Sequence, residues 1–128
     1  MGDMLMHLPC IEAAKTSDGY DFTPFFRYLQ DYIQDADYAV ANLETTFGGD
    51  KYVYQGNPAF NCPDALAADA AEVGYDMFLT SNNHSGDTMA DGILRTLEVS
   101  QKAGLDTLGS QMPDEKRYSI IEINGIKI

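Results

Sequence analysis

The sequence YDMFLTSNNHSG, residues 75–86, joins an apolar run to a polar motif. Its first part, Tyr75 to Leu79, is a short apolar run of the kind that forms a buried strand. Its second part places Asn82-Asn83-His84 directly after that run. In an α/β protein the carboxyl ends of parallel strands meet at one edge of the sheet, where ligands bind. We therefore expect this polar motif to lie at a functional edge.

Two further polar motifs carry side chains that can bind a ligand. Asn42-Leu43-Glu44 follows the apolar run 38–41, and Gly2-Asp3 stands at the start of the chain. Two strand ends that carry Glu44 and Asn83-His84 would bring a carboxylate, an amide oxygen and an imidazole close together. That mixture suits a hard or borderline divalent metal, or general acid–base catalysis.

Helical and extended patterns alternate along the rest of the chain, which predicts a layered α/β domain of order βαβαβ followed by further strands. The predicted helices cover 24–33, 63–73 and 88–103, and the predicted strands cover 38–43, 75–79, 105–108, 118–123 and 126–128. Asn124-Gly125 between the last two strands is typical of a hairpin with a type I′ turn. Gly74 is expected just beyond the end of the second helix.

The helices have identifiable caps and apolar faces. Thr23 followed by Pro24 resembles an N-cap and a first helical position, and Asp87 is a plausible cap for the third helix. Helical spacing predicts two buried stripes: Phe25, Phe26, Leu29, Tyr32 and Ile33 in the first helix, and Met89, Ile93, Leu94 and Leu97 in the third. We interpret both as core packing, with Leu66, Ala70 and Val73 inward in the second helix.

Composition limits the possible partners. Hydrophobic residues make up 45% of the 128 residues, which favours one folded domain over a disordered chain. Twenty acidic and eight basic residues give a net charge of −12, which would repel nucleic acid and anionic lipid. An acidic surface also favours cation binding, although solubility is the simpler explanation for the net charge. The sequence has no apolar run of about 18 residues and no visible signal peptide, so we expect no membrane contact by this segment.

Three features leave alternatives open. Residues 46–62 are rich in Gly, Asn, Tyr and Pro and read as a long irregular segment, either a substrate flap or an ordinary covering loop. Cys10 and Cys62 match no zinc site and are expected to be free thiols. No strand precedes Gly2, and Ile126 to Ile128 stops within a strand, so we expect part of a larger domain truncated at both ends. The alternative is a complete small domain with a frayed C-terminus.

An ordered set of motifs resembles a known family. GDMLMH at 2–7, DYAVANLET at 37–45 and YDMFLTSNNHSGDTMADGILRTLEVSQKAGLDTLG at 75–109 look like the capsule-synthesis CapA/PgsA family. YQGNPAFNCPDALAADAAEVGYD at 54–76 and YSIIEINGIKI at 118–128 fit the same pattern, so the resemblance covers nearly the whole chain. Members are associated with poly-γ-glutamate capsule production and resemble calcineurin-like metallophosphatases. The implied fold is a layered α-β-β-α sandwich, of which this chain would be the βαβαβ half with a C-terminal hairpin.

The resemblance also implies roles for individual residues at a site for two divalent metal ions, with Mn, Fe, Zn and Mg not distinguished. Asp3 resembles the first-metal carboxylate, Glu44 the bridging carboxylate and Asn83 the amide ligand of the second metal. His84 resembles the adjacent acid that steadies a leaving group. Asn82 is expected to support the loop or contact substrate.

Two departures from the family pattern limit this expectation. Calcineurin-like enzymes carry Asp-x-His at the first motif, whereas His7 lies four residues after Asp3, so we do not assign His7 as a ligand. The family's later histidine motifs are also missing from this chain, which has two histidines in all. We therefore expect the chain alone to be catalytically inactive, with weak or no metal occupancy.

Three functional hypotheses follow. The first is that the parent protein is a metal-dependent hydrolase acting on a phosphoester or a γ-glutamyl amide, located outside the cytoplasm, at the cell surface or anchored to the membrane. The second is a non-catalytic capsule-assembly component that handles an anionic polymer. The third is a structural fragment that self-associates through an exposed half-core.

Overall fold

Four short parallel strands form the main sheet, in the order β1-β2-β3-β4. They are β1 (Asp3–Met4), β2 (Val40–Leu43), β3 (Met77–Leu79) and β4 (Asp106–Leu108). The computed structural model describes residues 2–128. The three strands predicted from the apolar runs are present, although each is shorter than its run. The predicted α/β class, with parallel strands interleaved with helices, is confirmed.

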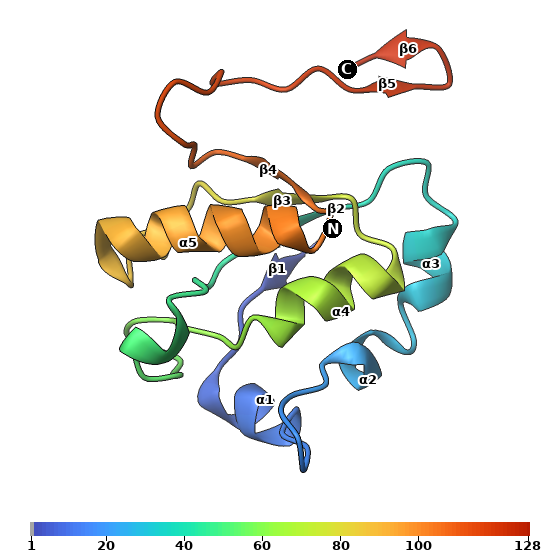
Figure 1. Ribbon diagram of the computed structural model, residues 1–128. Helices are drawn as coiled ribbons and strands as arrows, with labels where there is room; N and C mark the ends of the chain where they lie inside the picture. The colour runs from blue at the N-terminus through green and yellow to red at the C-terminus, as the bar shows by residue number, and fades with distance from the viewer. Residues whose placement is uncertain (1) are drawn as a thin grey trace.

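The helices lie below the strands in Figure 1, and a small hairpin lies above them. Consecutive parallel strands joined by right-handed crossovers place their helices on one face of a sheet, which accounts for this arrangement. The helical elements are α1 (Leu8–Ala13), α2 (Thr23–Phe26), α3 (Gln30–Gln34), the 3₁₀ turn η1 (Gly49–Lys51), α4 (Ala65–Val73) and α5 (Met89–Lys102). Gly74 ends α4 with φ 110°, as expected for a left-handed cap.

The C-terminal hairpin has the predicted turn. Strands β5 (Glu122–Ile123) and β6 (Ile126–Lys127) pair antiparallel. Asn124 and Gly125 between them have φ values of 53° and 80°. Two consecutive positive φ values are characteristic of a type I′ turn, so the interpretation of Asn124-Gly125 is confirmed.

The register of the sheet separates a core face from a site face. Asp3 pairs with Asn42 and Met4 pairs with Leu43. Because successive side chains of a strand point to opposite faces, Met4 and Leu43 share the face that the helices cover. Asp3 and Asn42 share the opposite face, side by side on neighbouring strands.

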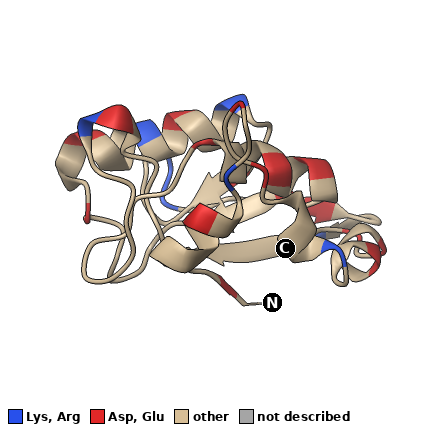
Figure 2. Cartoon of the chain, turned by 90° about the horizontal axis from the view of Figure 1, so that it is seen from below, with Lys and Arg blue, Asp and Glu red and all other residues tan. Residues whose placement is uncertain are grey.

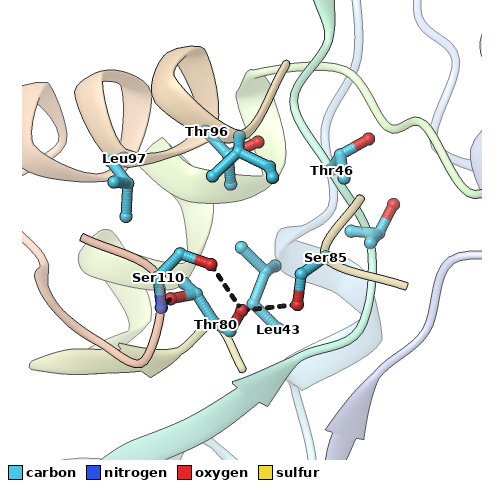
Figure 3. A pocket seen from close by; sticks show the side chains of 9 residues that line it. Leu43, Thr46, Thr80, Ser85, Thr96, Leu97 and Ser110 are labelled. Carbon is cyan, nitrogen blue, oxygen red and sulfur yellow. Dashed lines mark hydrogen bonds between the residues drawn. The ribbon is translucent and has the colours of Figure 1, made fainter. Parts of the chain in front are cut away.

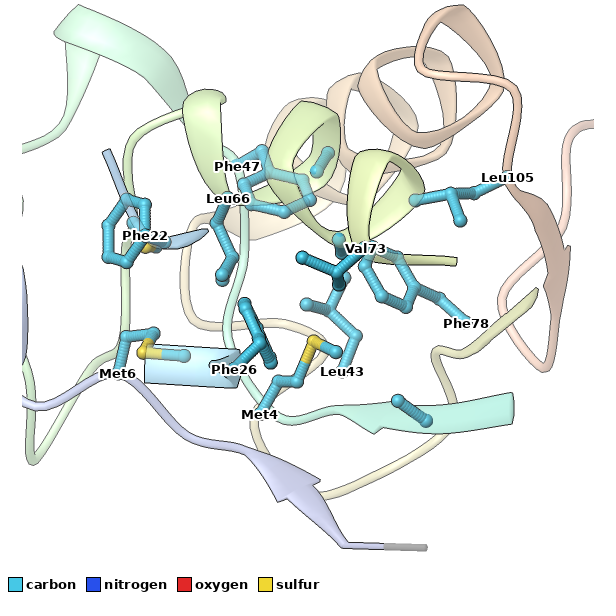
Figure 4. Packing of buried hydrophobic residues seen from close by; sticks show 14 of the residues in the cluster. Met4, Met6, Phe22, Phe26, Leu43, Phe47, Leu66, Val73, Phe78 and Leu105 are labelled. Carbon is cyan, nitrogen blue, oxygen red and sulfur yellow. The ribbon is translucent and has the colours of Figure 1, made fainter. Parts of the chain in front are cut away.

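The core lies between the sheet and the helices. Phe78 of β3 is fully buried there and packs with residues from most elements, as Figure 4 shows for its neighbours Leu43, Val73 and Leu105. Leu66, Ala70 and Val73 of α4 are buried, as predicted from their spacing. This cluster holds β2 and β3 in place, and the ends of both strands carry the polar motifs.

The first predicted apolar stripe is mostly wrong. The expected single helix is two short helices, α2 and α3, and only Phe26 and Ile33 of the stripe are buried. Phe25, Leu29 and Tyr32 are 41%, 52% and 79% exposed. Thr23 is the first residue of α2 rather than its cap, and its backbone N–H donates to Asp21 Oδ1 at 2.9 Å. Each short helix turns one apolar residue of the stripe to the core, Phe26 from α2 and Ile33 from α3, and the other three lie toward solvent.

The inner face of α5 also differs from the prediction. Leu97 is buried as expected, but Met89 and Leu94 are exposed. The buried face consists of Gly92, Thr96, Leu97 and Ser100. Thr96 Oγ1 donates to Gly92 O at 2.7 Å and accepts from Phe47 N–H at 2.9 Å, so its hydroxyl is satisfied inside the protein. A face of small and hydrogen-bonded side chains carries no apolar signal in the sequence.

The irregular segment 46–62 is anchored rather than free. Asn61 is 1% exposed, and its side chain accepts from Gly48 N–H at 2.7 Å and donates to the carbonyls of Tyr52 and Val53. Its backbone exchanges two hydrogen bonds with Gln55. These contacts favour the covering loop over a mobile flap, because opening the segment would leave buried polar groups unpaired.

The surface is acidic over much of the molecule. Figure 2 shows acidic residues on several helices and loops and only a few basic ones, in keeping with the net charge of −12. No helix within residues 2–128 is long and apolar enough to cross a membrane. Cys10 is partly buried and Cys62 is buried, and both are free thiols, as predicted.

Candidate functional site

The ends of β1 and β2 bring the two predicted carboxylates together. Asp3 lies in β1 beside Asn42 of β2. Glu44 follows β2 directly, and its backbone N–H donates to Met4 O at 3.1 Å, which extends the ladder between the strands. Asn42 and Glu44 are two residues apart on extended backbone, so their side chains point to the same face as Asp3.

One amide group joins these carboxylates. Asn42 Nδ2 donates to Asp3 Oδ1 at 2.9 Å and to Glu44 Oε2 at 3.0 Å. An amide nitrogen has two hydrogens, and both are used here. Asp3 and Glu44 carry like charges and would repel each other. Because the Asn42 amide donates to both, it holds the two carboxylates beside one nitrogen atom.

A second amide connects this pair to the loop after β3. Asn82 Nδ2 donates to Asn42 Oδ1 at 3.1 Å and to Leu43 O at 2.9 Å. Asn82 Oδ1 in turn accepts from the backbone N–H of His84 at 3.0 Å. The hydrogen bonds therefore run without a break from Asp3 and Glu44, through two asparagines, to the residue predicted as the acid.

His84 is held at its ring as well as its backbone. Its Nδ1 lies 2.8 Å from Asp87 Oδ2, and both side chains are largely buried. The same Asp87 oxygen accepts from the backbone N–H of Phe60 at 2.5 Å. The predicted role of Asp87 as a helix cap is wrong, because α5 begins at Met89 after Thr88, with no side-chain cap.

The side chains of Asn83 and His7 take no part in this hydrogen-bond network. Asn83 is exposed, and its side chain has no hydrogen-bond partner among residues 2–128. His7 is exposed and makes an edge contact with the Phe60 ring at 4.9 Å between centroids. Asn83 thus remains available to a ligand, whereas no contact of His7 with Asp3 or Glu44 is seen in the described part of the chain.

The donor set fits part of a metal site. Carboxylate and amide oxygens are the ligands that hard divalent cations prefer, and Asn42 keeps Asp3 and Glu44 close. However, residues 2–128 contain no group of three or more His, Cys, Asp or Glu side chains arranged to hold a metal ion.

Other groups near the strand ends are structural. A cavity of about 10 Å³ between β2, β3 and α5 is lined by Thr46, Thr80, Ser85 and Ser110 among others (Figure 3), and it has room for about one water molecule. Ser85 Oγ and Ser110 Oγ both donate to Thr80 O beside it. Burial raises the pKa of the Cys62 thiol, which makes it a poor nucleophile.

A scan against protein-family models matches residues 1–128 to the bacterial capsule synthesis protein PGA_cap. The chain belongs to the PGA_cap family. The match covers the whole chain, and it confirms the predicted resemblance to capsule-synthesis proteins. Among the curated proteins, none matches the chain.

Three residues of this PGA_cap domain were missed as parts of the site. Asn42 could have been found, because its position two residues before Glu44 on a strand places both on one face. Asp87 lies three residues after His84, but a position before a helix favoured the interpretation as a cap. Phe60 had no signal in the sequence, since its contact with His84 depends on the fold of the 46–62 segment.

Proposed function

We propose that this PGA_cap domain contributes Asp3, Glu44 and Asn83 to a divalent-metal site, and His84 as a proton donor, in a hydrolase-like protein of capsule synthesis. The observation that carries the proposal is the unbroken hydrogen-bond chain from the two carboxylates to His84. The two asparagines hold two carboxylates and a histidine at one edge of the sheet. This arrangement favours a preorganised ligand site over an ordinary turn.

Each residue has a definite task in this proposal. Asn42 holds the two carboxylates close together, and Asn82 fixes the backbone at His84. Asn83 extends from the same loop and would supply a neutral oxygen ligand. Divalent cations at such a site supply Lewis-acid polarisation of a phosphoryl or carbonyl oxygen. His84 beside it would give a proton to the leaving group.

The substrate in this proposal is a phosphoester or a γ-glutamyl amide, met at the cell surface. The net charge of −12 disfavours broad contact with an anionic polymer, so such a substrate would be engaged locally and through cations. The chain alone would not hydrolyse it, because two carboxylates and an amide are too few ligands for two metals.

Calorimetric titration with Mn²⁺ tests the proposal. The chain should bind Mn²⁺ weakly, with a dissociation constant on the order of 1 mM, since few ligands are present. Asp3→Asn and Glu44→Gln should each weaken binding by about tenfold, equivalent to about 1.4 kcal/mol, because each removes one charged ligand.

Asp91→Asn is the matched control, since Asp91 is an exposed carboxylate that pairs with Lys51 away from the strand edge. It should leave Mn²⁺ binding unchanged. Equal affinities in all four proteins would contradict the proposed site. Hydrolysis of bis(4-nitrophenyl) phosphate by the chain alone, lost in Glu44→Ala, would contradict its predicted inactivity.

A further inference from the structure

We infer that Asp87 is a positioning residue that fixes the imidazole of His84 and joins it to the 46–62 segment. The inference rests on the proposed function for its catalytic meaning. Its structural part stands on contacts that involve no metal and no substrate. Asp87 has no role as a helix cap, so its two short hydrogen bonds require another explanation.

A single oxygen atom makes both contacts. Asp87 Oδ2 lies 2.8 Å from His84 Nδ1 and accepts from Phe60 N–H at 2.5 Å. The side chains of His84 and Asp87 are only 18% and 13% exposed, so solvent competes little for these bonds. His84 and Asp87 both belong to the loop between β3 and α5, whereas Phe60 belongs to the 46–62 segment, so the Asp87 carboxylate joins two separate parts of the chain.

The chemistry of the acceptor decides the tautomer of the histidine. An ionised carboxylate only accepts hydrogen bonds, so the proton must be on His84 Nδ1. The neutral ring then has its lone pair on Nε2, which has no hydrogen-bond partner among residues 2–128. Nε2 is therefore the ring nitrogen left free to contact a substrate.

Packing restricts the ring further. The Phe60 ring meets the His84 ring edge to face, with centroids 4.6 Å apart and an interplanar angle of 74°. Phe60 is 2% exposed and precedes the fully anchored Asn61. The backbone of Phe60 binds Asp87 while its side chain contacts His84, so one residue of the 46–62 segment supports the imidazole from two sides.

The tautomer can be measured by long-range ¹H–¹⁵N NMR of the chain labelled at histidine, at a pH of about 8, where an ordinary imidazole is neutral. The chain has two histidines, so His7 serves as an internal reference without a carboxylate partner in the described structure. We expect His84 to show the Nδ1–H form. Asp87→Asn should produce a mixture of both tautomers, because an amide can also donate, whereas Asp87→Glu should restore Nδ1–H.

Two results would overturn the inference: an Nε2–H tautomer for His84 in the unaltered chain, or an Asp87→Asn spectrum identical to that of the unaltered chain. The first needs no variant and is decisive even if Asp87→Asn fails to fold. Asp91→Asn is the control, since it removes an exposed carboxylate of α5 and should leave both histidine spectra unchanged.

Mn²⁺ titration separates this inference from the proposed function. Asp87→Asn should change the His84 tautomer but leave Mn²⁺ binding unchanged, because Asp87 is not one of the proposed ligands. If the tautomer depends on Asp87 but Asp3→Asn and Glu44→Gln bind Mn²⁺ as the unaltered chain does, the positioning role stands and the proposed site fails. If Mn²⁺ binding weakens in those two variants while the Asp87→Asn spectrum matches that of the unaltered chain, the site stands and the positioning role fails.

Discussion

Replacing Phe78 with alanine is expected to lower the free energy of unfolding by about 3–5 kcal/mol. Phe78 is fully buried at the centre of the core, between the sheet and α4. Removing its ring takes apolar surface out of the core and leaves a cavity that the neighbouring residues cannot fill completely. Urea unfolding followed by circular dichroism measures the loss.

Phe25→Ala is the matched control, because Phe25 is 41% exposed although the sequence placed it in the same kind of apolar stripe. Its loss should be about 1 kcal/mol or less, as for partly exposed positions. Similar losses for the two variants would mean that α2 packs on the core through Phe25, and would contradict the exposed position of that side chain.

Asn61→Ala should have the second largest effect, a loss of about 3 kcal/mol or more in the free energy of unfolding. The substitution leaves the N–H of Gly48 and the carbonyl of Tyr52 without their partner inside a buried segment. Because Phe60 is adjacent, the NMR signals of His84 should also shift. Thermal and urea unfolding measure the first effect, and the histidine spectrum measures the second.

Asn83→Ala provides the comparison for Asn61→Ala. Asn83 is an exposed asparagine whose side chain has no hydrogen-bond partner among residues 2–128. Its replacement should change stability by about 0.5 kcal/mol or less. If Asn61→Ala were equally mild, the 46–62 segment would not be anchored by Asn61, and a mobile flap would again be the better interpretation.

The alternation of strands and helices could be predicted from the sequence because it depends on local signals. The apolar runs before Asn42 and Asn82 are short and bounded by polar residues, so few other interpretations were possible. The hairpin at Asn124-Gly125 followed from backbone preferences alone. In each case neighbouring residues in the chain determine the outcome.

The predictions that were wrong concern features that depend on tertiary contacts. Helical spacing could not reveal that the helix is interrupted between Phe26 and Gln30, since the same spacing of apolar residues fits one helix or two. The buried face of α5 relies on Thr96 and Ser100, whose hydroxyls are satisfied only by their place in the fold. The bond between Asp87 and Phe60 joins residues 27 positions apart, and no local pattern announces it.

Mn²⁺-induced broadening of backbone NMR signals locates a metal site on this chain without any variant. At substoichiometric Mn²⁺, paramagnetic broadening falls steeply with distance, so the first signals lost mark the binding position. We expect the amide signals of Asp3, Asn42, Glu44 and Asn83 to broaden first, while those around Asp91 and Glu98, two exposed carboxylates of α5, persist. Broadening that begins at Asp91 or Glu98, or that spreads evenly over all exposed carboxylates, would contradict a metal site at the ends of β1 and β2.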